Sequence, residues 1–167
     1  MRYGKAWMSV EWRTTMNEMK NSNNHIKGFK TIIRYKHGFR VAKVNRRKAI
    51  RYFCAECVGW ETYEIEKCNG KHLDGYMCSF HSFRSGKGKQ NAKKRDAAIK
   101  KQCRYCMQGN FISISSCTSR YCPIYPYRNH RIDRTYFFPA SWPDDKILNS
   151  GLANRFNFVD MGCREAD

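Results

Sequence analysis

Residues 49–57 read AIRYFCAEC and residues 98–106 read AIKKQCRYC, so one Ala-Ile-x3-Cys-x2-Cys pattern occurs twice, 49 residues apart. A third cysteine of each copy aligns at the same offset. After a five-residue difference in length, residues 78–84 (CSFHSFR) align with residues 122–128 (CPIYPYR). An ordered series of matches of this kind indicates a duplicated module.

The repeated cysteines have spacings typical of zinc sites, namely Cys-x2-Cys-x10-Cys-x9-Cys and Cys-x2-Cys-x10-Cys-x4-Cys. Zinc prefers four soft ligands at tetrahedral corners, and a two-residue spacer lets a knuckle place two sulfurs on one ion. Four protein ligands leave no open position, so we expect two structural zinc ions. The predicted ligands are Cys54, Cys57, Cys68 and Cys78 in the first module, and Cys103, Cys106, Cys117 and Cys122 in the second.

Two alternatives to this ligand assignment remain open. His81 lies three residues after Cys78 and is a good zinc ligand type, but its counterpart Tyr125 is not, which favours Cys78. The eight cysteines could instead form disulfides. The first twelve residues contain no apolar signal-peptide run, so we expect a reducing compartment, where such motifs favour metal. Cys163 has no partner in the repeat and is expected to be an ordinary thiol.

The chain is strongly basic, with a formal net charge of +18 over 167 residues. Residues 140–167 carry five acidic and three basic residues, a net −2, so residues 1–139 hold a net +20. This surplus favours a polyanionic partner, of which nucleic acid is the commonest. A basic face for solubility or for an acidic protein is the alternative. No window approaches the ~18 apolar residues of a membrane span, so no membrane partner is expected.

Local patterns predict the secondary structure. Residues 45–54 and 96–103 show helical spacing of apolar residues, with Asp96 as the expected N-cap of the second helix. After each knuckle we expect a short strand or turn, at residues 63–65 and 111–114, then the second cysteine pair and an extended tail. Residues 31–35 and 39–44 flank a Lys-His-Gly turn and predict a β-hairpin.

The sequence therefore predicts a small α+β fold that zinc stabilises. Two tandem related zinc modules, each a short helix plus zinc knuckles, follow the β-hairpin. The basic, glycine-containing segment at residues 85–95 is typical of a linker. The predicted divisions are an N-terminal segment with the hairpin at 1–44, zinc module 1 at 45–84, the linker at 85–95, zinc module 2 at 96–128 and a C-terminal extension at 129–167.

Basic residues on the two helices, in the linker and after the last ligands are candidates for phosphate contacts. Arg84 and Arg128 form a matched pair, because an arginine that recurs beyond the last cysteine suits a bidentate phosphate contact. Internal ion pairs are the alternative role for both. The candidate nucleic-acid-binding residues are Arg46, Arg47, Lys48, Arg51, Arg84, Lys93, Lys94, Arg95, Lys100, Lys101 and Arg128.

Residues 96–128 closely resemble a small cysteine-rich module of tailed bacteriophages, in which an Ala-Ile helix leads into Cys-x2-Cys, a glycine, a second cysteine pair and a Cys-Pro-Leu-Tyr-Pro-Tyr-Arg-like end. Residues 47–84 resemble it loosely, because both prolines are absent from residues 79–83. These phage proteins are mostly uncharacterised, so the resemblance says little about activity. It implies zinc binding, a phage origin and a place in the host bacterial cytoplasm.

Three functions remain open. The first is binding of nucleic acid, with DNA favoured over RNA. The second is binding of a host or virion protein complex, such as the transcription or translation machinery. The third is a zinc-braced endonuclease of the His-metal finger kind, for which His72, Asp74, His81 and Asn91 supply the residue types without the usual order. A non-enzymatic role is favoured, because no catalytic triad, nucleotide-binding loop or paired-carboxylate site is present.

Overall fold

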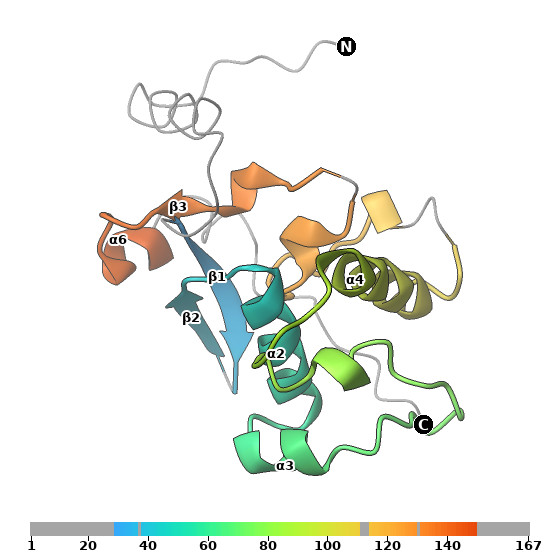
Figure 1. Ribbon diagram of the computed structural model, residues 1–167. Helices are drawn as coiled ribbons and strands as arrows, with labels where there is room; N and C mark the ends of the chain where they lie inside the picture. Colours follow the sequence, from blue (N-terminus) through green and yellow to red (C-terminus); the bar gives the residue numbers. More distant parts are fainter. Residues whose placement is uncertain (1–28, 37, 111–113, 130, 150–167) are drawn as a thin grey trace, which may run out of the picture.

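The computed structural model describes residues 29–36, 38–110, 114–129 and 131–149 (Figure 1). Among these residues the chain forms a small α+β fold. The elements in order are β1 (Phe29–Tyr35), β2 (Gly38–Ala42), α2 (Arg46–Cys57), α3 (Thr62–Lys67), the 3-10 helix η2 (His81–Phe83), α4 (Ala92–Cys106), the 3-10 helices η3 (Tyr125–Tyr127) and η4 (Arg134–Tyr136), β3 (Phe138–Pro139) and α6 (Asp144–Leu148).

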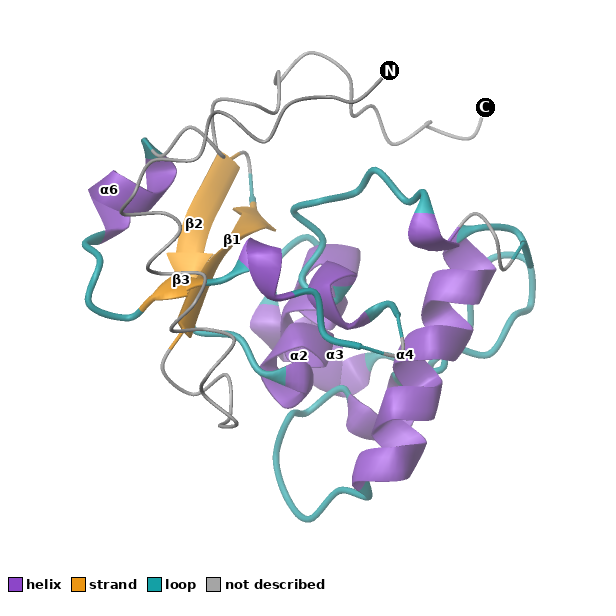
Figure 2. Cartoon of the chain, turned by 90° about the horizontal axis from the view of Figure 1, so that it is seen from above, coloured by secondary structure: helices purple, strands orange, loops and turns teal. Residues whose placement is uncertain are grey.

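β1 and β2 pair antiparallel, with Ile33 opposite Arg40, which confirms the predicted hairpin. His37, in its predicted turn, lies outside the described residues. The two-residue strand β3 pairs antiparallel with the other edge of β1 and gives the order β2-β1-β3. Nothing in the sequence pattern predicted β3, because two residues carry no recognisable alternation. Figure 2 shows the sheet and α6 on one side of the molecule and α2, α3 and α4 on the other.

The two predicted module helices are present as α2 and α4. The side-chain oxygen of Asn45 caps α2 by accepting from the Lys48 N–H at 2.9 Å. The prediction that Asp96 caps the second helix is wrong: Asn91 caps α4 and accepts from the Lys94 N–H at 3.0 Å. Residues 92–95, predicted as linker, are therefore helical. Lysine and arginine are good helix formers, and an asparagine before them supplies the cap.

Three local predictions are also wrong: the strand or turn at residues 63–65, the knuckles placed after the helices, and the extended tails. Residues 63–65 lie in α3, not in a strand or turn, and Ile65 is its one buried residue. Each Cys-x2-Cys pair lies in the last turns of a helix, and η2 and η3 replace the expected extended tails. Short apolar patterns do not distinguish a helical turn from a strand. Residues 111–113 lie outside the described residues.

The segments that align in the sequence have some local features in common. α2 and α4 end alike, with the Val58 N–H donating to the Cys54 carbonyl at 3.2 Å and the Met107 N–H donating to the Cys103 carbonyl at 3.1 Å. The helices η2 and η3 occupy aligned positions of the two copies. The two copies thus share helix ends and 3-10 turns as well as cysteine spacing.

One cluster of buried side chains connects the hairpin with both modules. Its members come from β1, β2, the loop before α2, α2, α4 and the segments after the fourth cysteines: Ile33, Ala42, Val44, Ala49, Ile50, Phe80, Ala98, Ile99, Ile124, Tyr127 and Phe137. A smaller cluster contains Ile32, Tyr121, Phe138 and Ile147. α2 lies between the sheet and α4 (Figures 1 and 2), so the copies pack into a shared core.

In the described part of the chain, no helix has both the length and the apolar character needed to cross a membrane.

Candidate metal centres and basic surface

The four cysteines of module 1 line a single cavity. α2 supplies Cys54 and Cys57 from its last turns, Cys68 follows α3, and Cys78 follows a tight turn at residues 71–77. The rest of the lining is Phe53, Val58, Ile65, His72, His81 and Arg84. Burial and, to a smaller extent, the neighbouring thiols together raise the pKa of the Cys54 thiol to about 12. Four soft sulfur donors therefore face one small, largely apolar space.

The cysteines of module 2 are arranged in a related way. Cys103 and Cys106 occupy the last turn of α4, and Cys117 and Cys122 lie in the segment that follows. Burial raises the pKa of Cys103 to about 12, with Cys106 and then Cys117 contributing as neighbours. Burial also raises the pKa of Cys122 well above its ordinary value. The Gln102 side-chain amide lies 3.9 Å from the Cys106 sulfur and donates to it.

All eight described cysteines are free thiols. As the side chains lie, no three histidine, cysteine, aspartate or glutamate residues in the described ranges form a group that would hold a metal ion. Tetrahedral zinc would need sulfurs about 3.8 Å apart around one centre, so some thiols would have to rotate inward. Cysteine has a single side-chain torsion, which makes such a rotation a local change. In donor type and number the residues fit zinc.

Each histidine beside the first cavity has a different environment. The Nε2 atom of His81 lies 3.0 Å from the carbonyl oxygen of Cys68. A Cβ added at Gly70 would lie 2.6 Å from the His81 ring, so that ring packs tightly against the backbone. These contacts give His81 a structural role. The Nε2 atom of His72 is buried without a hydrogen-bond partner among the described residues, which costs about 1–3 kcal/mol.

The structure does not bring the four nuclease-type residues together. Asn91 is the N-cap of α4, and Asp74 accepts a hydrogen bond from the Tyr105 hydroxyl at 2.7 Å. This hydrogen bond lowers the pKa of Asp74 and raises that of Tyr105 to about 12. His72 and His81 line one cavity, and Asp74 lies near His72. Asn91 lies at the other end of α4 from Tyr105, so the four residue types do not form one site.

Arg84 and Arg128 make equivalent internal contacts. The Arg84 guanidinium donates to the backbone carbonyls of His81 at 2.6 Å and Ile65 at 3.1 Å. Arg128 is buried and donates to the carbonyl of Tyr125 at 2.9 Å, and its guanidinium lies 3.6 Å from the centre of the Tyr125 ring. Both guanidinium groups are therefore used for contacts inside the protein, the alternative role considered for them above. Nothing in these contacts supports a role for the two arginines in binding phosphate.

The other basic residues predicted to contact phosphate fall into two groups, of which the first is paired with carboxylates or half-buried. Arg46 forms an ion pair with Asp96 at 3.1 Å, and Arg51 forms one with Glu66 at 3.0 Å. Arg47 and Arg95 are half-buried. The second group is exposed and consists of Lys48 on α2 and of Lys93, Lys94, Lys100 and Lys101 on α4.

α4 carries a basic face opposite its buried face. Ala98, Ile99 and Gln102 are buried, whereas the four exposed lysines named above recur at helical spacing on the outer side. The exposed Arg104 lies four residues after Lys100 and extends this face. Arg104 was not among the predicted phosphate contacts, because the predicted helix ended at residue 103. We call Lys93, Lys94, Lys100, Lys101 and Arg104 the α4 basic face.

The turn at residues 71–77 of module 1 packs on α4 of module 2. The rings of Tyr76 and Tyr105 stack with centroids 4.0 Å apart and planes 10° from parallel. The Lys101 ammonium lies 5.5 Å from the centre of the Tyr76 ring. Aromatic groups from both copies therefore flank the α4 basic face.

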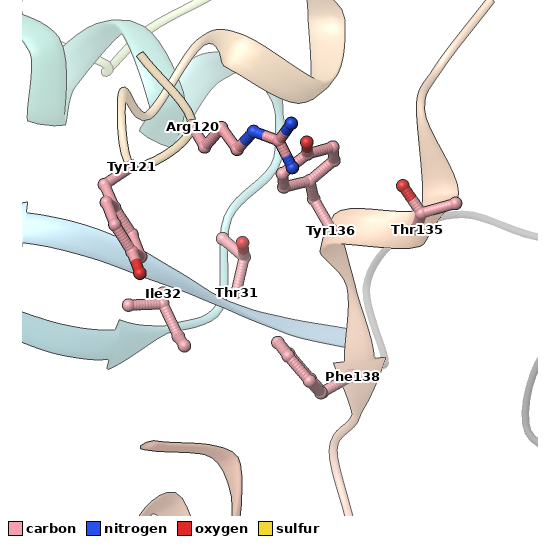
Figure 3. Close-up of a pocket in the computed structure, with 7 residues that line it drawn as sticks. All are labelled: Thr31, Ile32, Arg120, Tyr121, Thr135, Tyr136 and Phe138. Carbon is pink, nitrogen blue, oxygen red and sulfur yellow. The ribbon is translucent and has the colours of Figure 1, made fainter. Parts of the chain in front are cut away.

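A separate shallow pocket lies between the sheet and the segment around residue 120 (Figure 3). Its lining consists of Thr31, Ile32, Arg120, Tyr121, Thr135, Tyr136 and Phe138. None of the residues predicted from the sequence as ligands or phosphate contacts lines it. Compared with known protein families, curated proteins and solved structures, the chain matches none.

Proposed function

We propose that this protein binds nucleic acid, most favourably duplex DNA, through the α4 basic face, and that two structural zinc ions stabilise the fold that presents this face. The observation that carries the proposal is the gathering of exposed cations on one side of α4. A helix of 15 residues is about 22 Å long and fits the major groove, which is about 12 Å wide.

Three lysines of α4 are exposed and form no ion pair with a described residue, whereas two arginines of α2 are paired with carboxylates. Lys93, Lys94 and Lys100 form no ion pair within the described part of the chain. Arg46 and Arg51, in contrast, are paired with carboxylates. Phosphate groups would be the counterions of the unpaired lysines, and release of bound cations from DNA would favour association.

Zinc would act in this proposal as a structural element. Cys103 and Cys106 lie at the end of α4, so a metal bound there would connect this helix to the segment that carries Cys117 and Cys122. Ligand sets made only of protein side chains couple metal binding to folding. We also propose, from the resemblance to phage modules, that the protein acts in the host cytoplasm during infection.

A second candidate function is binding of a host or virion protein complex. The observation that favours it is exposed apolar surface: Leu73 is fully exposed, and Tyr63 and Met77 are 58% and 52% exposed. Leu73 and Met77 belong to one turn, and apolar side chains gathered at one place on a protein surface are typical of docking surfaces. Salt dependence separates the two candidates, because phosphate contacts give a steep fall of affinity with salt.

The test is a comparison of two double variants with equal net charge. Lys93→Gln/Lys100→Gln removes two charges from the α4 basic face, and Lys36→Gln/Lys43→Gln removes two exposed charges from the hairpin region. Binding to a fluorescent DNA duplex is measured by anisotropy over a series of salt concentrations.

We expect the α4 variant to bind more weakly and to lose about 2 from the slope of log affinity against log salt, since each phosphate contact contributes about 0.9. The hairpin variant should remain close to the wild type. Equal losses in both variants would contradict an interface at α4, and absence of duplex binding by the wild type would contradict the proposed function.

A further inference from the structure

The first candidate zinc site contains more donors than zinc needs. Besides Cys54, Cys57, Cys68 and Cys78, the same cavity is lined by His72. The Nε2 atom of His72 is buried, and it has no hydrogen-bond partner among the described residues. A buried imidazole nitrogen without a partner is rare in folded proteins, and a nitrogen beside four thiols has the chemistry of a metal ligand.

The backbone of the turn holds His72 in this position. The His72 N–H donates to the Tyr76 carbonyl at 2.9 Å, and the His72 carbonyl accepts from the Gly75 N–H at 3.0 Å. At the base of the turn, the Cys78 N–H donates to the Gly70 carbonyl at 2.7 Å. His72 and Cys78 are thus parts of one hydrogen-bonded unit, so a metal bound by Cys78 would have His72 close by.

Aromatic packing also limits the movement of the His72 ring. Its centroid lies 5.0 Å from the Tyr105 ring and 5.7 Å from the Tyr76 ring. Tyr105 is held in turn by its hydrogen bond to Asp74. The other histidine of the cavity, His81, has its Nε2 atom against the Cys68 carbonyl. His72 is therefore the histidine with a nitrogen free to bind a metal.

His72 is present in the first copy of the repeat but not in the second. The first module has five more residues than the second between its third and fourth cysteines, and His72 lies in that longer segment. The second module has no counterpart, so its site has cysteines alone. Zinc takes four ligands, so a fifth donor in the first module must replace one thiol. Cys57 is the most exposed of the four thiols of the first module, so it is the one that a fifth donor would replace at least cost. Cys106 is exposed as well, but the second module has no fifth donor to replace it.

We propose that His72 is a zinc ligand in place of Cys57, so that module 1 binds zinc through Cys54, Cys68, Cys78 and His72 while module 2 uses four cysteines. This inference rests on the zinc sites of the proposed function. Replacing one thiolate by a neutral imidazole reduces the charge of the zinc site from −2 to −1, which weakens the repulsion between ligands. Cys57 is left as a free thiol at the surface.

The matched pair Cys57→Ser and Cys106→Ser tests this assignment, because the two cysteines hold equivalent positions in the copies. Zinc per full-length chain is measured after removal of loosely bound metal. We expect Cys57→Ser to keep two zinc ions and Cys106→Ser to keep one. Loss of one zinc ion from both variants would overturn the role of His72.

Thiol labelling of the zinc-loaded wild type gives a second readout. N-ethylmaleimide should modify Cys57 but not Cys106, as located by peptide mass mapping. In His72→Ala, Cys57 should become a ligand and gain protection. Protection of Cys57 in the wild type would overturn the inference and leave the zinc sites intact, whereas labelling of all eight module cysteines would overturn the proposed zinc sites themselves.

Cadmium substitution distinguishes the ligand sets directly. The ¹¹³Cd chemical shift of a four-thiolate site lies well downfield of that of a site with three thiolates and one nitrogen. We expect two separate resonances of these two kinds from the wild type, and two resonances of the four-thiolate kind from His72→Ala. Two four-thiolate resonances from the wild type would overturn the inference.

Discussion

Arg128 is 8% exposed, and its guanidinium makes a hydrogen bond to the Tyr125 carbonyl, stacks on the Tyr125 ring and lies 3.5 Å from Asp133. Arg84 repeats the bond to the carbonyl three residues before it. At the scale of the residue, the recurring arginine thus closes the 3-10 turn that follows the last cysteine of each copy. A planar guanidinium suits this double role better than an ammonium.

Arg128→Lys should therefore lower the free energy of unfolding by about 2 kcal/mol, because lysine cannot both stack and donate to the carbonyl. Chemical denaturation measures this loss. The affinity of the folded variant for duplex DNA and its salt slope should stay at wild-type values. Unchanged stability with weaker DNA binding would show that Arg128 contacts phosphate instead.

Cys54→Ser and Cys103→Ser should each cost one zinc ion per chain and destabilise the fold, since metal binding and folding are coupled when all ligands are protein side chains. Elemental analysis of purified protein gives the stoichiometry. The control is Cys163→Ser, which should keep both ions. Retention of two ions by Cys54→Ser or Cys103→Ser would be inconsistent with the ligand assignment.

At this scale the sequence predicted which residues matter better than it predicted what their side chains contact. The alignment showed that Arg84 and Arg128 recur, but a repeated arginine is compatible with a phosphate contact and with an internal one. The decision depended on backbone carbonyls of η2 and η3, whose turns the sequence pattern did not predict. His72 was similarly ambiguous, because burial of its Nε2 atom depends on the fold around it.

At the scale of the element, α4 begins at Ala92, four residues before the predicted cap. The segment with Lys93, Lys94 and Arg95 shows no apolar periodicity and follows a glycine-containing stretch, so it was predicted to be part of a linker. Their intrinsic helix propensity and the Asn91 cap extend the helix toward its N-terminus. This extension places Lys93 in line with Lys100, and Lys94 in line with Lys101, two turns further along the helix, and so creates the α4 basic face.

Asn91→Ala should lower the free energy of unfolding by about 1 kcal/mol, the usual cost of removing an N-cap side chain. Asn45→Ala, at the equivalent position of α2, should cost a similar amount. Asp96→Ala should cost less, because it removes no cap and its ion pair with Arg46 is partly exposed to solvent and screened. A larger effect at Asp96 than at Asn91, measured by thermal or urea unfolding, would restore Asp96 as the cap.

The hairpin and both helices were predictable because their patterns are strong and local. The pairing of β1 with Phe138 and the position of α3 were not predictable. The first joins segments more than a hundred residues apart, and the second contains a single buried residue, Ile65. Element type in short segments depends on tertiary packing more than on propensity.

At the scale of the whole molecule, the hairpin, α2, α4 and the segments after both fourth cysteines share one buried cluster. Tyr76 stacks on Tyr105 across the two copies, and Arg46 pairs with Asp96 between α2 and α4. Neither copy has a separate core among the described residues. The repeated modules should therefore unfold together.

Ile33→Ala tests this cooperativity, because Ile33 is 1% exposed and lies in the shared cluster although it precedes both modules. The substitution should cost about 2–5 kcal/mol and lower the melting temperature in a single transition. Circular dichroism reports the helices and tryptophan fluorescence reports tertiary packing. Loss of the hairpin with the helical signal unchanged would mean that the modules fold independently.

The most direct test of the central claim is the native mass spectrum of the full chain mixed with a short DNA duplex. We expect one dominant complex whose mass is that of one duplex and the chain with two zinc ions, with every cysteine free of disulfides. A chain without zinc, with its mass lowered by disulfide formation, would contradict the zinc sites. A chain with two zinc ions that leaves the duplex unbound would contradict the role of the α4 basic face.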